Sequence, residues 1–182
     1  MPHFDINVPG AVPGIRQPSS MSCWATVTTM MMSWRDSTSY AIAEAMDAIG
    51  AVYRTKFDND QGLSGSDKPK FLVAAGFVAE APMSFSVAGF RSLLEFNGPL
   101  WVTTDEDPTA GFAIHARIAT GMSGDGTVDN TFLRIVDPAD GGQHQESFRL
   151  FMRKFEEEAA TGQPLRVQVV HFPAGVGPGG AR

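Results

Sequence analysis

A chain of 182 residues, 43% of them hydrophobic and 19% charged, is large and apolar enough for one globular domain with its own core. Its formal net charge of −6 at pH 7 disfavours a nucleic-acid partner or an anionic membrane surface, because both require clustered lysine and arginine. No apolar segment approaches the ~20 residues of a membrane-spanning helix, so we expect a soluble protein without membrane insertion.

The first half of the chain is predicted to be an extended start followed by helices. Residues 1–20 are rich in Pro, Gly and Ser, which is typical of an extended segment. Residues 22–35 carry apolar side chains at helical spacing, and Ser20 or Ser22 can act as the N-cap. Three further helices are predicted at about 40–49, 67–75 and 86–96.

The second half has the composition of a β-sheet. Short segments rich in β-branched and aromatic residues, separated by turn residues, lie at 99–104, 112–121 and 131–138. A helix near 145–160 and a strand at 165–172 follow. Helices followed by a mainly antiparallel sheet predict an α+β fold, in which a helical half and a sheet half meet along one cleft.

The same pattern predicts the limits of the domain. We expect an extended lead-in over residues 1–14, the folded domain over 15–172 and a flexible tail over 173–182. A single cysteine cannot form an internal disulfide, and the first residues lack the cationic and apolar regions of a secretory signal. We therefore expect a protein that is cytoplasmic or is exported by a specialised secretion system without a cleavable signal peptide.

The only cysteine, Cys23, lies at the predicted start of the helix at 22–35. Unpaired backbone N–H groups and the helix macrodipole favour negative charge there, and the thiolate is the reactive form of cysteine. A nearby histidine can hold the thiolate as an ion pair and later protonate a leaving amine. Cys23 is thus a candidate nucleophile, although a lone cysteine is more often a small core residue.

Three further residues can complete such a site. His115 lies inside a predicted strand, and Asp137 ends the next strand 22 residues later, so neighbouring antiparallel strands can bring the two together. Gln17 lies six residues before Cys23, where its amide could donate to the oxyanion of a tetrahedral intermediate. The alternatives are a strand histidine bonded to a carbonyl, an Asp-Pro turn and an ordinary loop amide.

The sequence Gln17…Cys23-Trp24-Ala25 resembles the nucleophile signature of papain-like cysteine proteases. The order of "NGPLWV" at 97–102, a histidine and "VDP" at 136–138 is similar to compact bacterial members, namely effector and staphopain-type proteases and the leader peptidases of bacteriocin exporters. An interval of 92 residues from the cysteine to the histidine also favours this bacterial branch over the plant and lysosomal enzymes.

The resemblance implies a papain-like fold in which the cysteine-bearing helix packs against the sheet half. It implies Cys23 as nucleophile, His115 as general base and acid, Asp137 as the residue that orients the imidazole, and Gln17 as the oxyanion donor. No cofactor is implied. The implied partners are a protein or peptide substrate and, for a delivered toxin or effector, a cognate inhibitor or immunity protein.

Three functions remain open on the sequence. The first is a cysteine endopeptidase, in the setting of a bacterial toxin or effector. The second is an amidase, deamidase or acyltransferase that uses the same triad on protein or peptidoglycan, and the third is a non-catalytic peptide-binding module. Trp101, Phe112 and the loop at 58–66 are candidates for the walls of a substrate pocket.

A metal site is not predicted. The four histidines are scattered and show no zinc-ligand spacing, and "DNDQG" at 58–62 lacks the pattern of a calcium loop. Consecutive methionines at 30–32 face different directions on a helix, so we interpret them as core residues rather than copper ligands.

Overall fold

The computed structural model of the protein describes residues 3–106, 114–160 and 169–178. Its helices in these ranges are α1 (Cys23–Asp36), α2 (Ile42–Ile49), α3 (Ala51–Asp58), α4 (Lys68–Ala75), α5 (Val87–Asn97) and α6 (Phe148–Ala160). Its strands there are β1 (Phe4–Asn7), β2 (Val78–Ala79), β3 (Leu100–Asp105), β4 (Ile114–Gly124), β5 (Thr131–Asp137), β6 (Gly142–Ser147) and β7 (Val170–His171). None of the helices described is long and apolar enough to cross a membrane.

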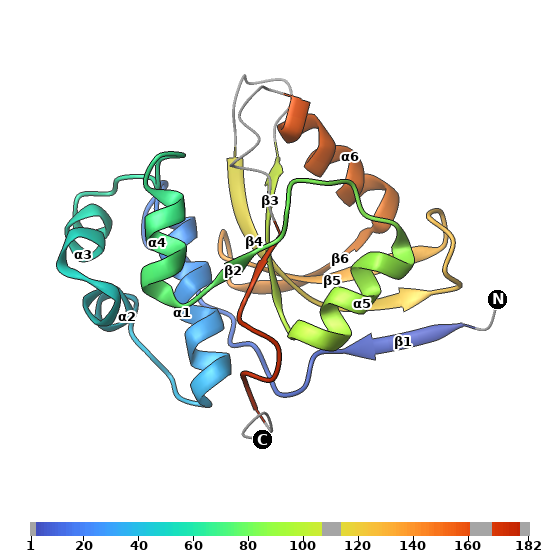
Figure 1. The fold of residues 1–182 in the computed structure, drawn as a ribbon, viewed down its shortest axis with the longest axis horizontal. Coiled ribbons are helices and arrows are strands. Elements are labelled where there is room, and N and C mark those ends of the chain that lie inside the picture. The colour runs from blue at the N-terminus through green and yellow to red at the C-terminus, as the bar shows by residue number, and fades with distance from the viewer. Residues whose placement is uncertain (1–2, 107–113, 161–168, 179–182) are drawn as a thin grey trace.

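The strands form one antiparallel sheet in the order β2-β7-β3-β4-β5-β6, and β1 pairs separately with β4. Helices α1 to α4 gather at one end of the molecule, whereas α5 and α6 lie against the sheet half (Figure 1). The predicted α+β fold, with helical and antiparallel sheet halves, is confirmed.

Helix α1 is the central element of the helical half, and every residue from Trp24 to Trp34 is buried. A helix that is buried all round is held by packing rather than by propensity. Its threonines satisfy their buried hydroxyls within the helix, since Thr28 Oγ1 donates to Trp24 O at 2.8 Å and Thr29 Oγ1 to Ala25 O at 2.8 Å. The β-branched residues are therefore tolerated at the centre of the fold.

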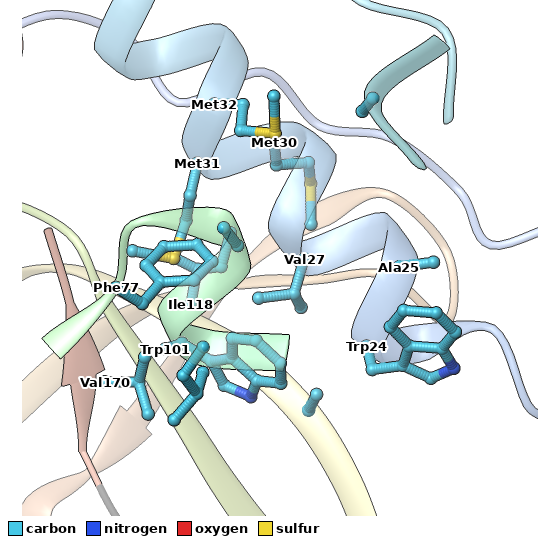
Figure 2. Close-up of a cluster of buried hydrophobic side chains, with 14 of the residues drawn as sticks. Trp24, Ala25, Val27, Met30, Met31, Met32, Phe77, Trp101, Ile118 and Val170 are labelled. Atoms are coloured by element: carbon cyan, nitrogen blue, oxygen red, sulfur yellow. The ribbon is translucent and has the colours of Figure 1, made fainter. Parts of the chain in front are cut away.

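The methionines of α1 fill the core between this helix and its neighbours, as predicted. Met30 and Met31 are fully buried and Met32 nearly so. Figure 2 shows their side chains leaving α1 in different directions, with Met31 extending toward Phe77. Flexible, unbranched side chains suit the irregular spaces that such a helix must fill.

Alternate residues of the sheet serve two separate cores. Trp101 of β3 packs with α1 and the other helices of the first half, in a core that includes Trp24 and Phe71. The flanking residues Leu100 and Val102 belong to a second core with α5 and α6. Because side chains alternate across a strand, β3 lies between the two cores and contributes to both.

Differences from the predicted elements have local causes. The predicted helices at 22–35, 40–49, 67–75 and 86–96 correspond to α1, α2, α4 and α5 within two residues, but α3 was not predicted. Gly50 ends α2 with a backbone φ of 154°, and the chain immediately begins α3.

Three polar or short strands were also not predicted from the sequence, among them β2 at Val78–Ala79. The helix predicted from residue 145 begins at Phe148, because residues 142–147 instead extend the sheet as β6. Within the expected lead-in, residues 4–7 form β1 and pair with β4. Of the strand predicted at 165–172, residues 165–168 lie outside the described part, and Val170–His171 forms β7.

Candidate active site

A cavity of about 890 Å³ opens between the start of α1 and the neighbouring ends of β3, β4 and β5. Gln17, Cys23, His115 and Asp137, the four candidate site residues, all line it. They come from a loop, a helix and two strands that are separated by up to 120 positions in the sequence. Their convergence on one cavity makes it the candidate active site.

Cys23 is the first residue of α1 and is half-buried at the wall of the cavity. Of the two predicted N-cap candidates, Ser22 is the N-cap residue, but its side chain makes no capping bond to the helix. Its Oγ instead donates to Ser19 O at 2.8 Å and accepts from Ser19 N at 3.2 Å. The backbone N–H groups in the first turn of α1 therefore receive no bond from the Ser22 side chain, and the start of a helix is a place that suits an anion.

His115 and Asp137 form a close pair across two strands. His115 Nε2 lies 2.6 Å from Asp137 Oδ1, and the same oxygen accepts the Ala139 N–H at 2.8 Å. The last pair of the β4–β5 ladder joins Ile118 to Val136. Extending that register by one residue places Asp137 diagonally opposite His115 on the same face, which explains the contact.

The surroundings favour the charged forms of both groups. Burial disfavours the imidazolium of His115, but the hydrogen bonds with Asp137 and with the Cys23 side chain outweigh it and raise the pKa of His115 to about 9. Burial likewise opposes ionisation of Asp137, yet its bonds with His115 and with the Ala139 N–H lower its pKa. At neutral pH the site thus holds an imidazolium between the Cys23 sulfur and the Asp137 carboxylate.

Gln17 connects the two sides of the site. Its backbone N–H donates to Pro138 O at 2.7 Å, directly after Asp137. Its side-chain Nε2 donates to Ser19 O at 2.9 Å and lies 3.4 Å from Ser20 O, within the turn that precedes Cys23. The amide has two N–H bonds, and both are directed to carbonyls of this turn, which fixes its position.

The pocket walls include residues that were predicted from the sequence and others that were not. Trp101 and residues 62–65 of the loop line the cavity, whereas Phe112 lies outside the described residues. Lys68 and Glu106 also line it and were not predicted. Neither residue carries a recognisable motif, so only the folded arrangement reveals them.

Glu106 belongs to a buried ionic cluster behind the site. Arg117 Nη2 lies 2.9 Å from Glu106 and 3.0 Å from Glu146, and Lys154 Nζ lies 2.7 Å from each carboxylate. Burial raises the pKa of Glu106, but the bonds from Lys154 and the charge of Arg117 lower it overall. Arg117 lies two residues after His115 on β4, so the strand period places both side chains on one face.

The other strand histidines lie elsewhere. His144, predicted in a polar turn, is on the exposed strand β6 and contacts Asp140 at 2.9 Å. His171 is buried on β7 and contacts Glu80 at 2.9 Å. Among the residues that the structure describes, no group of three or more His, Cys, Asp and Glu side chains could hold a metal ion.

Comparison with known families gives a match over most of the chain. The sequence model of the family described as papain-like cysteine protease AvrRpt2 matches residues 3–156. This range includes the start of β1, the whole helical half and all four candidate site residues. No curated protein matches the chain.

Proposed function

The chain belongs to the AvrRpt2 family of papain-like cysteine proteases, and from this premise we propose that it is an endopeptidase with Cys23 as nucleophile, His115 as acid and base, and Asp137 as orienting residue. Gln17 is the side-chain donor of the oxyanion hole. The family makes the protein a hydrolase of the bacterial effector branch, with a protein substrate. A delivered toxin or effector role in another cell is part of the proposal.

Acylation of the enzyme is the first half of the reaction. The Cys23 thiolate attacks the carbonyl carbon of the scissile peptide bond, and the oxyanion is stabilised by the Gln17 amide and the Cys23 backbone N–H. The tetrahedral intermediate collapses as protonated His115 delivers its proton to the leaving amine. The products are the released amine and a thioester on Cys23.

Hydrolysis of the thioester restores the enzyme. Neutral His115 removes a proton from water, and the resulting hydroxide attacks the thioester carbonyl. The second tetrahedral intermediate expels the Cys23 thiolate and leaves the imidazolium beside it. The carboxylate of Asp137 holds the ring in one orientation during both halves.

The observation that supports these roles most strongly is the 2.6 Å contact between His115 Nε2 and Asp137 Oδ1 within the cavity that Cys23 lines. With Nε2 held by the carboxylate, Nδ1 is the nitrogen left for Cys23, whose side chain bonds the same ring. The imidazole can therefore exchange a proton through Nδ1 with the Cys23 sulfur or with a leaving group, while Nε2 stays bonded to Asp137.

Cys23→Ala tests the nucleophile. Fluorescein-labelled casein should be cut by the wild type and left intact by the variant, and iodoacetamide or E-64 should modify the wild type at Cys23 and stop cleavage. Cleavage by Cys23→Ala at the wild-type rate would refute the assignment. Intact-mass measurement separates the alternatives, since an endopeptidase gives fragments whereas a deamidase or acyltransferase leaves the substrate chain uncut.

A further inference from the structure

The loop after α3 contacts the turn that precedes Cys23. Asp60 Oδ1 accepts the Met21 N–H at 2.9 Å, and Asp60 Oδ2 accepts the Ser20 hydroxyl at 3.2 Å. The next carbonyl of the loop, Gln61 O, accepts the indole N–H of Trp24 at 3.1 Å. Two consecutive residues of this loop therefore hold the segment on both sides of Cys23, although about 40 positions separate them in sequence.

Asp60 has a special backbone conformation. Its φ is 49°, in the left-handed region that few residues other than glycine adopt, although Asp and Asn tolerate it best. Its N–H donates to Phe57 O at 3.0 Å and so closes the end of α3. A strained conformation of this kind persists when the surrounding contacts determine it, and such residues cluster at functional sites.

The turn that Asp60 holds is also the turn that holds Gln17. The carbonyls of Ser19 and Ser20 accept from the Gln17 amide, and the side chain of Ser20 and the N–H of Met21 are bound by Asp60. Hydrogen bonds from Ser19 and from the Met21 N–H lower the pKa of Asp60, so its carboxylate is ionised at neutral pH. The contacts thus run from Asp60 through the turn to Gln17.

We propose that Asp60 is a positioning residue for the oxyanion hole, which fixes the turn at residues 19–21 and through it the Gln17 amide. This inference rests on the proposed role of Gln17. Without the carboxylate, the turn loses two acceptors and the amide loses its fixed place. A donor displaced from the oxyanion loses most of its effect on the transition state, since catalysis requires geometry held to within a fraction of an ångström.

Asp60→Gly and Asp60→Asn form a matched pair of variants. Glycine keeps the positive φ without strain but removes both acceptors, and asparagine keeps one carbonyl oxygen for the Met21 N–H. With labelled casein, Asp60→Gly should lower kcat about 10- to 100-fold, in line with the loss of one oriented donor. Asp60→Asn should stay within about 3-fold of the wild type, because the bond that fixes the turn is retained.

The rate at which iodoacetamide alkylates Cys23 separates a positioning role from a general structural defect. A general defect in Asp60→Gly would change this rate, whereas a displaced oxyanion donor would not. The reaction needs the thiolate but develops no oxyanion, so its rate in Asp60→Gly should stay within about 2-fold of the wild type. A parallel loss of alkylation and turnover would overturn the proposal, and so would an unchanged kcat. Failure of the nucleophile assignment would show differently, as turnover by Cys23→Ala.

A double variant tests the route through Gln17. If Asp60 acts by placing the Gln17 amide, Asp60→Gly should cost no more than about 2-fold on top of Gln17→Ala, because the shared interaction is already lost. Independent, additive losses would overturn this route. The route through Gln17 would also be overturned if kcat were lost in Asp60→Gly but normal in Gln17→Ala.

Discussion

His115 Nε2 lies 2.6 Å from Asp137 Oδ1, and the two side chains are only 16% and 18% exposed. A charge-assisted hydrogen bond this short, shielded from water, is among the stronger polar contacts in proteins. It holds the imidazole in one orientation at the end of two paired strands. The titration of His115 should therefore report on its partners.

The first prediction concerns the pKa of His115. Burial lowers it, while Asp137 and Cys23 raise it, and the result is about 9. Without one of these partners, less remains to offset the lowering of the pKa by burial. Asp137→Asn and Cys23→Ala should therefore each lower the pKa of His115. Histidine resonances followed by NMR against pH will measure it, with the exposed His144 as an internal reference. A value that does not change in either variant would contradict the partner assignment.

The second prediction is a loss of activity in alkaline solution. Acylation requires a proton on His115 for the leaving amine, and that proton is lost as the pH rises through about 9. The kcat/KM on labelled casein should thus fall on the alkaline side with an apparent pKa near this value. In Asp137→Asn the fall should begin at lower pH. Activity that continues to rise well above this pH would rule out His115 as the proton donor.

The third prediction links the same titration to stability. The folded pKa of about 9 exceeds the ordinary value of 6.5, so the stabilising contribution is complete below 6.5 and is lost as the pH rises through 9. At 1.36 kcal/mol per unit, it amounts to about 3 kcal/mol. Urea unfolding of wild type and His115→Gln should show a stability difference that shrinks by about this amount across that range. A constant difference would contradict the pKa.

The sequence was sufficient to predict the pair because short-range features determine it. His115 and Asp137 lie near the ends of consecutive strands with clear β-branched patterns, and antiparallel neighbours bring such ends together. The position of Cys23 at the start of a helix was predicted in the same way, from the apolar residues at helical spacing that follow it. Periodicity and chain order were enough to locate these residues, whereas their roles were implied by the resemblance to papain-like proteases.

Other parts of the molecule depend on contacts that no local pattern encodes. The polar strand β6 has an exposed surface and is stabilised by pairing with β5, so its residues alone did not indicate a strand. Glu106 and Arg117 meet Glu146 and Lys154 through the closure of the sheet against α6. Asp60 approaches Met21 only because α2 and α3 return the chain to the start of α1.

The fourth prediction concerns the oxyanion donor. Gln17→Ala removes the amide that the turn at Ser19 and Ser20 holds in place, and kcat should fall about 100-fold with KM little changed. The backbone bond from Gln17 to Pro138 is retained in the variant, so the fold should be preserved. Steady-state kinetics on labelled casein will measure the effect. An equal rise in KM with unchanged kcat would indicate substrate binding instead.

The fifth prediction concerns the ionic cluster behind the site. Arg117 is 5% exposed and contacts Glu106 and Glu146, so Arg117→Met leaves two carboxylates with Lys154 as their remaining cation in the cluster. One uncompensated buried charge should lower the free energy of unfolding by about 3 kcal/mol.

Arg54→Met is the matched control for that variant. Arg54 also contacts two carboxylates, Asp47 at 2.6 Å and Asp58 at 2.9 Å, but all three side chains are at least one third exposed. Its loss should cost much less than that of Arg117, since solvent screens exposed pairs. Urea unfolding will compare the two variants. The stability loss in Arg117→Met should shrink as the pH falls, because protonation removes the excess negative charge of the two carboxylates. Equal stability losses in both variants would show that burial does not amplify these contacts.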